Sequence, residues 1–326
     1  MNHSASPPKI SVIVPTYNRA LRLPALVASL EAQDTDAAFE VVIVDDGSSD
    51  ETPTVLAELE RRSPAALHVV RCDANKGPAA ARNRGWRAAS SAYVVFTDDD
   101  CTPQPGWLRA MLAALADHCF VQGRTQPDPS QIDRAGAFRR TVDVGGENGF
   151  YETCNMAYRR DVLEQLGGFD ETFPLAAGED TDLGCRARGR SFRFAFAPDA
   201  VVYHDVVDQG FVGYVRNTKR WAGVVRVVRR HPHLRRFFLR GPFWLPRQYL
   251  VVVSAIGFAV AIGVQRQPAS AIVAVMGVLP YATYRLGVSP LAAKGWRRVA
   301  TVPAAFIADV AEVGTHVASV LRPGGR

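Results

Sequence analysis

Residues 10–19 read ISVIVPTYNR, an apolar, β-branched run that ends in polar, turn-forming residues. Three similar runs follow: FEVVIV at 39–44, LHVV at 67–70 and YVVFT at 93–97. Amphipathic stretches that begin at Leu21, Thr52, Pro78 and Gly106 lie between or after these runs. This alternation is typical of an α/β fold, in which helices cover both faces of a mostly parallel sheet. We expect that architecture for the N-terminal part of the chain.

The composition of the 326-residue chain is that of a folded protein, with 48% hydrophobic and 21% charged residues. Its five cysteines form no CxxC pair and no zinc-ligand spacing, which favours a reducing compartment without a disulfide framework. Residues 1–8 contain no apolar stretch suited to a signal peptide. We expect them to be disordered, and the domain of residues 9–208 that follows to stay in the cytoplasm.

Charge is divided unevenly along the chain. Residues 1–208 carry 21 Lys and Arg against 30 Asp and Glu, whereas residues 209–326 carry 17 against two. No acidic residue occurs between Gln209 and Ala308. Such a segment is expected to face an anionic partner, either a nucleic acid or a membrane surface.

The C-terminal part combines these basic residues with long apolar stretches. Residues 209–247 interleave basic and aromatic residues and are expected to lie at a membrane interface. Residues 248–265 and 267–284 are uncharged, and a helix of this length, about 27 Å, nearly spans the hydrocarbon layer. They predict a helical hairpin over 248–284 that either spans the membrane, with both ends cytoplasmic, or docks on its surface. Residues 285–326 are expected to form a basic helical segment.

Polar, turn-forming residues follow each of the four strands: PTYNR at 15–19, DDGSSD at 45–50, ANKG at 74–77 and DDD at 98–100. Each of these segments alone is ordinary turn chemistry. The carboxyl ends of parallel strands meet at one edge of a sheet, however, and ligands bind there. The four segments together predict a binding site at that edge.

The three adjacent carboxylates Asp98, Asp99 and Asp100 repel one another unless a cation or ligand donors offset the cost. Alternate side chains of an extended segment point to opposite sides, so Asp98 and Asp100 can share one target. Mg²⁺ and Mn²⁺ prefer oxygen ligands, and Mg²⁺ needs few of them from the protein. The triplet therefore predicts a seat for a metal-bound diphosphate.

Six segments occur in a fixed order: ISVIVPTYNR, VVIVDDGSSDET, NKGPAAARNRG, FTDDDCTPQPGWL, NMAYRRDVLEQLGGFDETF and GEDTDLGCRARGR. In order and spacing they resemble a family 2 glycosyltransferase, an inverting enzyme with the nucleotide-diphospho-sugar transferase (GT-A) fold. The resemblance covers roughly residues 9–206. It implies a nucleotide-diphosphate sugar as donor, a divalent metal ion, and transfer of one sugar to an acceptor hydroxyl with inversion.

Carried over residue by residue, the resemblance implies a donor site. This site would be lined by Pro15, Thr16, Tyr17, Asp45, Asp46, Lys76, Arg82, Asp98 and Asp99. Asp46, with Asp45 behind it, would accept from the nucleobase, and Lys76 and Arg82 would lie beside base and ribose. Asp100 would be the first metal ligand, followed by Asp98. His204 is a further candidate ligand through its neutral imidazole, or else a satisfied histidine at a strand end.

Inversion requires a base that deprotonates the acceptor hydroxyl on the face opposite the leaving group. The resemblance implies this role for Asp180 beside Glu179, because a neighbouring carboxylate makes a better base near neutral pH. A charged helix N-terminus is the structural alternative. The acceptor side would include Asn155, Asp182, Arg220 and Trp221. Asp182 is also an alternative to Asp180 as the base. Arg220 and Trp221 stand in NTKRW at 217–221, which departs from the QxxRW of processive members by its Asn.

Other classes of protein explain less of the chain. A receiver domain would not need the DDD triplet, and a dinucleotide-binding dehydrogenase would carry GxGxxG after its first strand. A nucleic-acid binder would not need the apolar stretches, so we expect a membrane and no nucleic acid as partner. A non-catalytic glycan- or nucleotide-binding relic of the same fold stays open. We expect a metal-dependent transferase at the cytoplasmic face of the cell membrane, acting on a lipid-linked glycan or a glycolipid.

Overall fold

The computed structural model describes residues 9–63, 66–132, 136, 138–173, 175–263, 269–287 and 299–321. The tail expected at residues 1–8 lies outside them. The chain divides into two compact units. The first lies within Met1–Pro129 and Thr141–Asp205, and the second within Ser130–Arg140 and Val206–Arg326.

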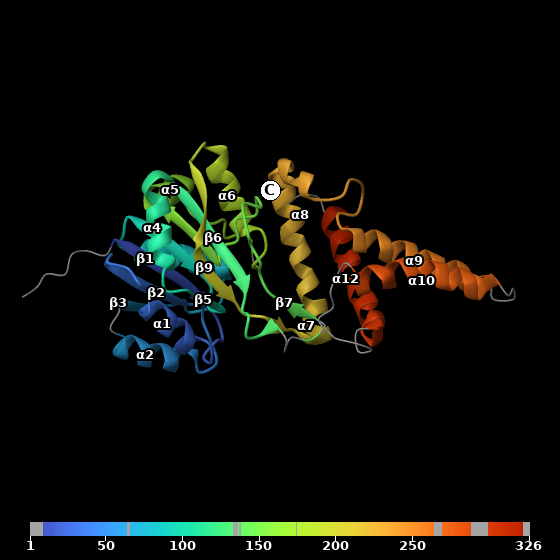
Figure 1. Cartoon of the computed structure of the whole chain (residues 1–326), viewed down its shortest axis with the longest axis horizontal. Helices are drawn as coiled ribbons and strands as arrows, with labels where there is room; N and C mark the ends of the chain where they lie inside the picture. Colours follow the sequence, from blue (N-terminus) through green and yellow to red (C-terminus); the bar gives the residue numbers. More distant parts are fainter. Residues whose placement is uncertain are drawn as a thin grey trace, which may run out of the picture. The chain divides into compact units, whose positions relative to one another are not determined.

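The first unit is built on one eight-stranded sheet (Figure 1). In spatial order its strands are β3 (Ala66–Arg71), β2 (Phe39–Asp45), β1 (Ile10–Thr16), β4 (Tyr93–Thr97), β8 (Asn155–Arg159), β6 (Phe120–Pro127), β9 (Phe194–His204) and β5 (Cys101–Pro103). The four expected strands β1 to β4 are parallel to their neighbours within this group. β8 runs antiparallel between β4 and β6, and β5 pairs antiparallel with β9. The mostly parallel sheet is confirmed, with antiparallel additions on one side.

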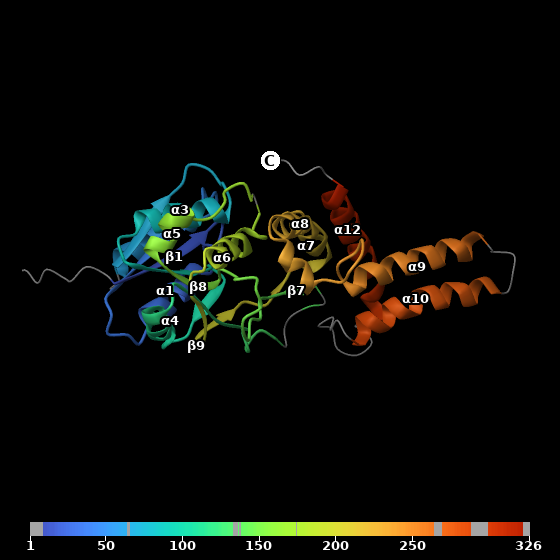
Figure 2. The ribbon, with the colours of Figure 1, turned by 90° about the horizontal axis from the view of Figure 1, so that it is seen from above.

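The helices of the first unit are α1 (Leu23–Glu31), α2 (Thr52–Arg62), α3 (Pro78–Ala88), α4 (Trp107–Asp117), α5 (Arg160–Leu166) and α6 (Glu179–Gly189). They cover both faces of the sheet, with α3 and α5 on one side and α1 and α4 on the other (Figure 2). Val12 and Val14 pack in the core formed with α1, α2 and α4, whereas Ile13 meets α3 at Gly85. A Cβ at Gly85 would lie 2.5 Å from Ile13 Cγ2, so this glycine lets α3 approach β1 closely.

The second unit is mainly helical. A short ladder of β7 (Arg139–Arg140) and β10 (Val207–Asp208) leads into α7 (Gly210–Asn217), η2 (Thr218–Arg220), α8 (Trp221–Arg230) and η3 (Pro232–Phe237). Next come α9 (Pro246–Gly263), α10 (Ala269–Gly287) and α12 (Val302–Leu321). α9 and α10 lie side by side in both views, and α12 packs against α7, α8 and α9 (Figures 1 and 2).

Both apolar stretches of the sequence are helical, since α9 and α10 cover most of 248–284, and residues 264–268 between them lie outside the described part. By length and composition, one helix among the described residues could cross a membrane, and it is α12, with a mean hydropathy of 1.4. The sequence had not singled out this helix. Insertion of α9 and α10 into a membrane stays a prediction.

The two acidic residues of the C-terminal part are both buried on α12. The Asp309 carboxylate accepts from Arg285 Nε at 2.9 Å and from the Tyr281 hydroxyl at 2.7 Å. The Glu312 carboxylate accepts from Arg247 Nε at 3.0 Å and Nη2 at 2.8 Å. Residues 209–326 contain no other acidic residue.

Candidate functional site

The ends of β1 and β4 meet as neighbouring parallel strands. Thr16 Oγ1, at the end of β1, donates to Asp99 Oδ2 at 2.7 Å, and Arg19 Nε lies 3.6 Å from Asp99 Oδ1. Burial, followed by the charge of Asp100, raises the pKa of Asp99 to about 7, although the Thr16 hydrogen bond and Arg19 oppose the shift. Asp99 thus ties the carboxylate triplet to the end of β1.

Asp98 turns towards α3 and meets Arg82. The buried guanidinium of Arg82 donates from Nη2 to Asp98 Oδ1 at 2.7 Å and from Nη1 to Glu179 Oε1 at 2.9 Å. Burial opposes the charge on Arg82, but the two carboxylates outweigh it and raise the pKa of this guanidinium. A permanently charged arginine therefore links the end of β4 to the start of α6.

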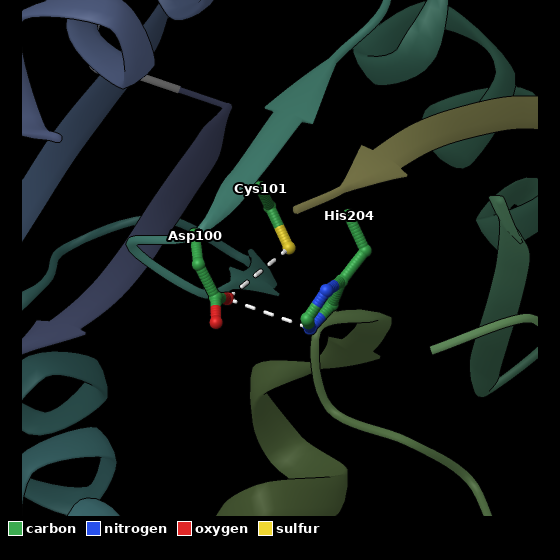
Figure 3. Close-up of side chains that lie close together, drawn as sticks. All are labelled: Asp100, Cys101 and His204. Atoms are coloured by element: carbon green, nitrogen blue, oxygen red, sulfur yellow. Dashed lines mark hydrogen bonds and ion pairs between the residues drawn. The ribbon is translucent and has the colours of Figure 1, made fainter. Parts of the chain in front are cut away.

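Asp100 lies beside His204 because β5 pairs antiparallel with the end of β9, in a register that sets Cys101 opposite His204 (Figure 3). His204 Nε2 lies 3.5 Å from Asp100 Oδ1. His204 Nδ1 is 2.9 Å from the carbonyl oxygen of Asp205, a contact that favours a proton on Nδ1 and leaves Nε2 towards Asp100.

This pair suits a divalent cation. Carboxylate oxygen and imidazole nitrogen are common ligands of first-row divalent metals. The third nearby group is the Cys101 thiol, whose sulfur lies 4.0 Å from Asp100 Oδ1. Burial raises the pKa of the Cys101 thiol far above its usual value, which disfavours the thiolate form while no cation is bound. Asp98, the other predicted ligand, already accepts from Arg82.

The candidate base lies at the first turn of α6. Glu179 is buried, whereas Asp180 is half-buried and its Oδ1 accepts from the backbone N–H of Thr181 at 2.7 Å. Burial, and then the charge of Asp180, raises the pKa of Glu179 to about 7, against the effect of Arg82. Asp180 is thus the member of the Glu-Asp pair that is more open to solvent.

The predicted nucleobase residues surround the loop after β3. The Asp46 carboxylate accepts from the backbone N–H groups of Lys76 at 3.1 Å and Gly77 at 2.8 Å. A pocket of about 430 Å³ lies against Asp46 and Lys76 and is also lined by Arg84 and Glu171. This pocket is large enough for part of a nucleotide.

Three other residues of the predicted donor site, Asp45, Pro15 and Tyr17, lie at or near the ends of β2 and β1. Asp45 Oδ1 accepts from the backbone N–H of Ser48 at 2.9 Å, so Asp45 supports the turn after β2. Pro15 is half-buried in β1, and Tyr17 is exposed just beyond that strand.

Of the four predicted acceptor residues, two are buried inside the first unit and two belong to the second unit. Asn155 is fully buried, accepting from Trp107 Nε1 at 2.7 Å and donating to the carbonyl oxygens of Arg124 and Ala200. Asp182 is fully buried and paired with Arg186 Nε at 2.8 Å. Arg220 and Trp221 belong to the second unit. There the ring of Trp221 packs edge-on against that of Trp244.

The sequence reasoning missed two groups of the first unit. Arg19, which contacts Asp99, stands in the quoted PTYNR segment without having been assigned a role. Glu152 and Gln122 form a hydrogen-bonded pair, and the charge of Asp180 acts on Glu152. Glu152 lies three residues before Asn155 in ETCNMAYRR, a segment in which the sequence pointed to Asn155 alone.

The comparisons with known proteins agree with a GT-A-like fold. The solved mannosyltransferase PcManGT of Pyrobaculum calidifontis, described in complex with GDP-Man and Mn²⁺, superposes with a TM-score of 0.61 at 24% identity. The superposition covers 94% of this chain and 88% of that one. This similarity supports a GT-A-like fold for the chain.

Matches to known families define the class of protein more narrowly than the fold does. Residues 11–167 match the family described as Glycosyl transferase family 2, and residues 93–286 match Glycosyl transferase family group 2. The chain belongs to the family 2 glycosyltransferases.

Curated relatives match only in part. The pre-mycofactocin glycosyltransferase of Mycobacterium tuberculosis is 30% identical over 220 residues, and the match covers 60% of this chain and 42% of that protein. The chondroitin synthase of Escherichia coli is 28% identical over 237 residues, and the match covers 60% of this chain and 34% of that protein. The chain thus spans less than half the length of these two relatives.

Proposed function

We propose that this protein is a metal-dependent inverting glycosyltransferase, which moves one sugar from a nucleotide-diphosphate donor to an acceptor hydroxyl. The observation that carries the proposal is the buried bridge from Asp98 through Arg82 to Glu179, with distances of 2.7 and 2.9 Å. It joins the carboxylate triplet, where a diphosphate would bind, to the helix that carries Asp180. The donor site and the helix that carries the base are thereby linked by hydrogen bonds.

Asp100 and His204 would hold Mg²⁺ or Mn²⁺, with Asp98 as a third candidate. The support is the 3.5 Å separation of His204 Nε2 from Asp100 Oδ1 and the chemistry of these donors. When bound, the metal supplies charge stabilisation for the departing nucleoside diphosphate. The solved structure of PcManGT, described in complex with GDP-Man and Mn²⁺, favours a divalent metal ion as cofactor.

Asp180 would act as the base. Its carboxylate takes the proton of the acceptor hydroxyl as that oxygen attacks the anomeric carbon, on the face opposite the nucleotide. The Thr181 N–H holds the Asp180 side chain in one orientation, which reduces the entropy cost of reaching the reactive geometry. Arg82 keeps Glu179 fixed behind it, so that the base lies on a rigid helix start.

The acceptor would be a lipid-linked glycan or a glycolipid at the cytoplasmic face of the membrane. Residues 209–308 contain no acid, and the two acids beyond them are buried in ion pairs. The excess positive charge would be drawn to anionic lipid by about 1 kcal/mol per basic residue near the surface. The apolar α12 supports membrane association.

The test of donor and metal is a thermal-shift screen in mild detergent, followed by product analysis. UDP-, dTDP- and GDP-sugars are added with and without Mn²⁺ or Mg²⁺. A nucleotide that raises the melting temperature only with metal, and a product whose anomeric configuration by NMR is inverted, support the proposal. If no nucleotide shifts the folded protein with any metal, the non-catalytic relic is the better interpretation.

The membrane part of the proposal is tested separately by flotation of the full chain with lipid vesicles. Vesicles containing phosphatidylglycerol should carry the protein, and added salt should weaken the binding to them. Equal flotation with pure phosphatidylcholine at all salt concentrations argues against the electrostatic attraction.

A further inference from the structure

A second carboxylate, Glu152, lies in the electrostatic neighbourhood of Asp180. Glu152 precedes β8, and its Oε2 accepts from Gln122 Nε2 of β6 at 2.8 Å. Its Oε1 accepts from Asn148 Nδ2, also at 2.8 Å. Burial above all, and also the charge of Asp180, raises the pKa of Glu152. Among the described residues, neutral amides rather than a Lys or Arg hold this carboxylate.

The loop that carries Glu152 is fastened to α6 at two points. Thr181 Oγ1 donates to the carbonyl oxygen of Phe150 at 2.7 Å. The ring of Tyr151 fills the space beside Gly184, where a Cβ would lie 2.3 Å from Tyr151 Cγ. Tyr151 itself has φ +54°, a left-handed conformation that costs a non-glycine residue about 1–3 kcal/mol. Glu152 is therefore held in a defined position relative to the helix of Asp180.

A buried acceptor atom beside Glu152 points to a ligand. Gln122 is 1% exposed, and its Oε1 has no hydrogen-bond partner within the described part of the chain. Because its Nε2 donates to Glu152, this amide oxygen lies next to the Glu152 carboxylate. Leaving such an acceptor unsatisfied costs about 1–3 kcal/mol, so a donor from outside the chain is expected to approach it.

The chemistry of the group limits what that ligand can be. Phosphates and carboxylates would be repelled by Asp180 and by ionised Glu152. The group of Asp100, Cys101 and His204 is the one set of metal-ligating side chains found close together among the described residues, and Glu152 is not part of it. Neutral hydroxyl groups, which donate to carboxylate and amide oxygens alike, suit the position best.

We propose that Glu152 and Gln122 form a subsite for a second hydroxyl of the acceptor, so that the group presented to Asp180 is a sugar with neighbouring hydroxyls rather than an isolated alcohol or a lipid phosphate. The proposal rests on the proposed function, because it takes Asp180 to mark where the reacting hydroxyl lies. Glu152 is a binding residue in this account, and the proton passes to Asp180.

The test compares Glu152→Gln with the full-length wild type. The glutamine has the same size and can still accept from Gln122 and Asn148 through its remaining oxygen, so the melting temperature should change little. Glu164→Gln, an exposed carboxylate on α5, is the matched control. Saturation-transfer NMR measures the binding of four methyl glycosides: the glucoside, galactoside, mannoside and N-acetylglucosaminide. The samples contain Mn²⁺ and the nucleotide that stabilises the protein, and if no nucleotide stabilises it, both are left out.

At least one glycoside should bind the wild type and E164Q and lose about tenfold or more in affinity to E152Q, because a hydrogen bond to a charged group is lost. In transfer assays, KM for the acceptor should rise by a similar factor while the donor affinity stays unchanged. If E152Q unfolds, Glu152→Asp, which keeps the charge but shortens its reach, should show the same loss more weakly.

Two results would overturn the subsite: no glycoside binds the wild type, or E152Q binds as tightly as E164Q. Failure of the proposed function has a different signature. If glycosides bind through Glu152 but no sugar is ever transferred, the subsite stands and the transferase activity falls. If transfer proceeds equally well in E152Q and wild type, the activity stands and the subsite falls.

Discussion

Arg82 on α3 donates to Glu179 on α6 at 2.9 Å, across 97 positions of sequence, and with its other terminal nitrogen to Asp98 at 2.7 Å. The guanidinium and the Glu179 carboxylate are both buried, so neither charge is solvated by bulk water. Such a pair is expensive to break from one side only, because the remaining charge stays in a medium of low polarity.

Replacement of Arg82 by Met should lower the free energy of unfolding by about 3–5 kcal/mol, because Glu179 and Asp98 lose the cation between them. Arg84→Met on the exposed face of the same helix is the control and should change it by less than about 0.5 kcal/mol. Urea denaturation followed by circular dichroism measures both. A loss below 1 kcal/mol in R82M would mean that the bridge contributes little.

Glu179 should make stability depend on pH between 4.5 and 7. Its pKa is about 7 in the folded protein against an ordinary value of 4.5, so the folded state binds the proton more tightly. The resulting stabilisation is complete below pH 4.5 and is lost as the pH rises through 7. Glu179→Gln should flatten this decline, while Asp99, whose pKa is also raised, titrates in both proteins. Identical pH slopes for variant and wild type would contradict the shift.

His204→Gln should weaken the response to Mn²⁺. Loss of the imidazole removes one of the three predicted ligands, and even outer-shell substitutions at metal sites cost about 10–100-fold in affinity. The Mn²⁺ concentration that gives half of the thermal shift should therefore rise by about tenfold or more. His118→Gln at the end of α4 serves as the control. A wild-type Mn²⁺ response in H204Q would remove His204 from the metal site.

The pair of Arg285 and Asp309 should hold α10 to α12. Arg285→Met or Asp309→Leu alone should destabilise the second unit by about 3–5 kcal/mol, since each leaves a buried charge without its closest ionic partner. The double variant should lose much less than the sum of both single losses. Denaturant unfolding in detergent gives the coupling free energy. Additive losses would show that the two charges do not depend on each other.

The fold of the N-terminal half could be predicted because its signals are local. β1 to β4 are apolar runs, and α1 to α4 begin at or just after the positions expected from amphipathic patterns. β5, only Cys101–Pro103, has no such signal, since its pairing with β9 depends on residues about a hundred positions away. α12 was missed as an apolar helix because Asp309 and Glu312 interrupt its sequence, and their burial against arginines is visible only in three dimensions.

The candidate site, too, could be predicted from the sequence only in part. Strand-end residues such as Thr16, Asp99 and Asp100 come together because parallel strands share an edge, and that rule can be applied to a sequence. The orientation of a side chain cannot be read from the sequence in this way. Asp182 stands two residues from Asp180, yet it faces Arg186 inside the protein. Glu152 is near Asp180 only because its loop is fastened to α6.

The most direct test of the central claim is the effect of Asp180→Asn on sugar transfer and on nucleotide binding, measured on the same preparation. Asp161→Asn, an exposed aspartate on α5, is the control. The account predicts that D180N loses about 10²–10⁴-fold in transfer rate, because general base catalysis contributes that much. The metal-dependent thermal shift by the donor nucleotide should stay as in wild type. Transfer at the wild-type rate, or a donor affinity that falls as far as the rate, would contradict the assignment of Asp180 as the base.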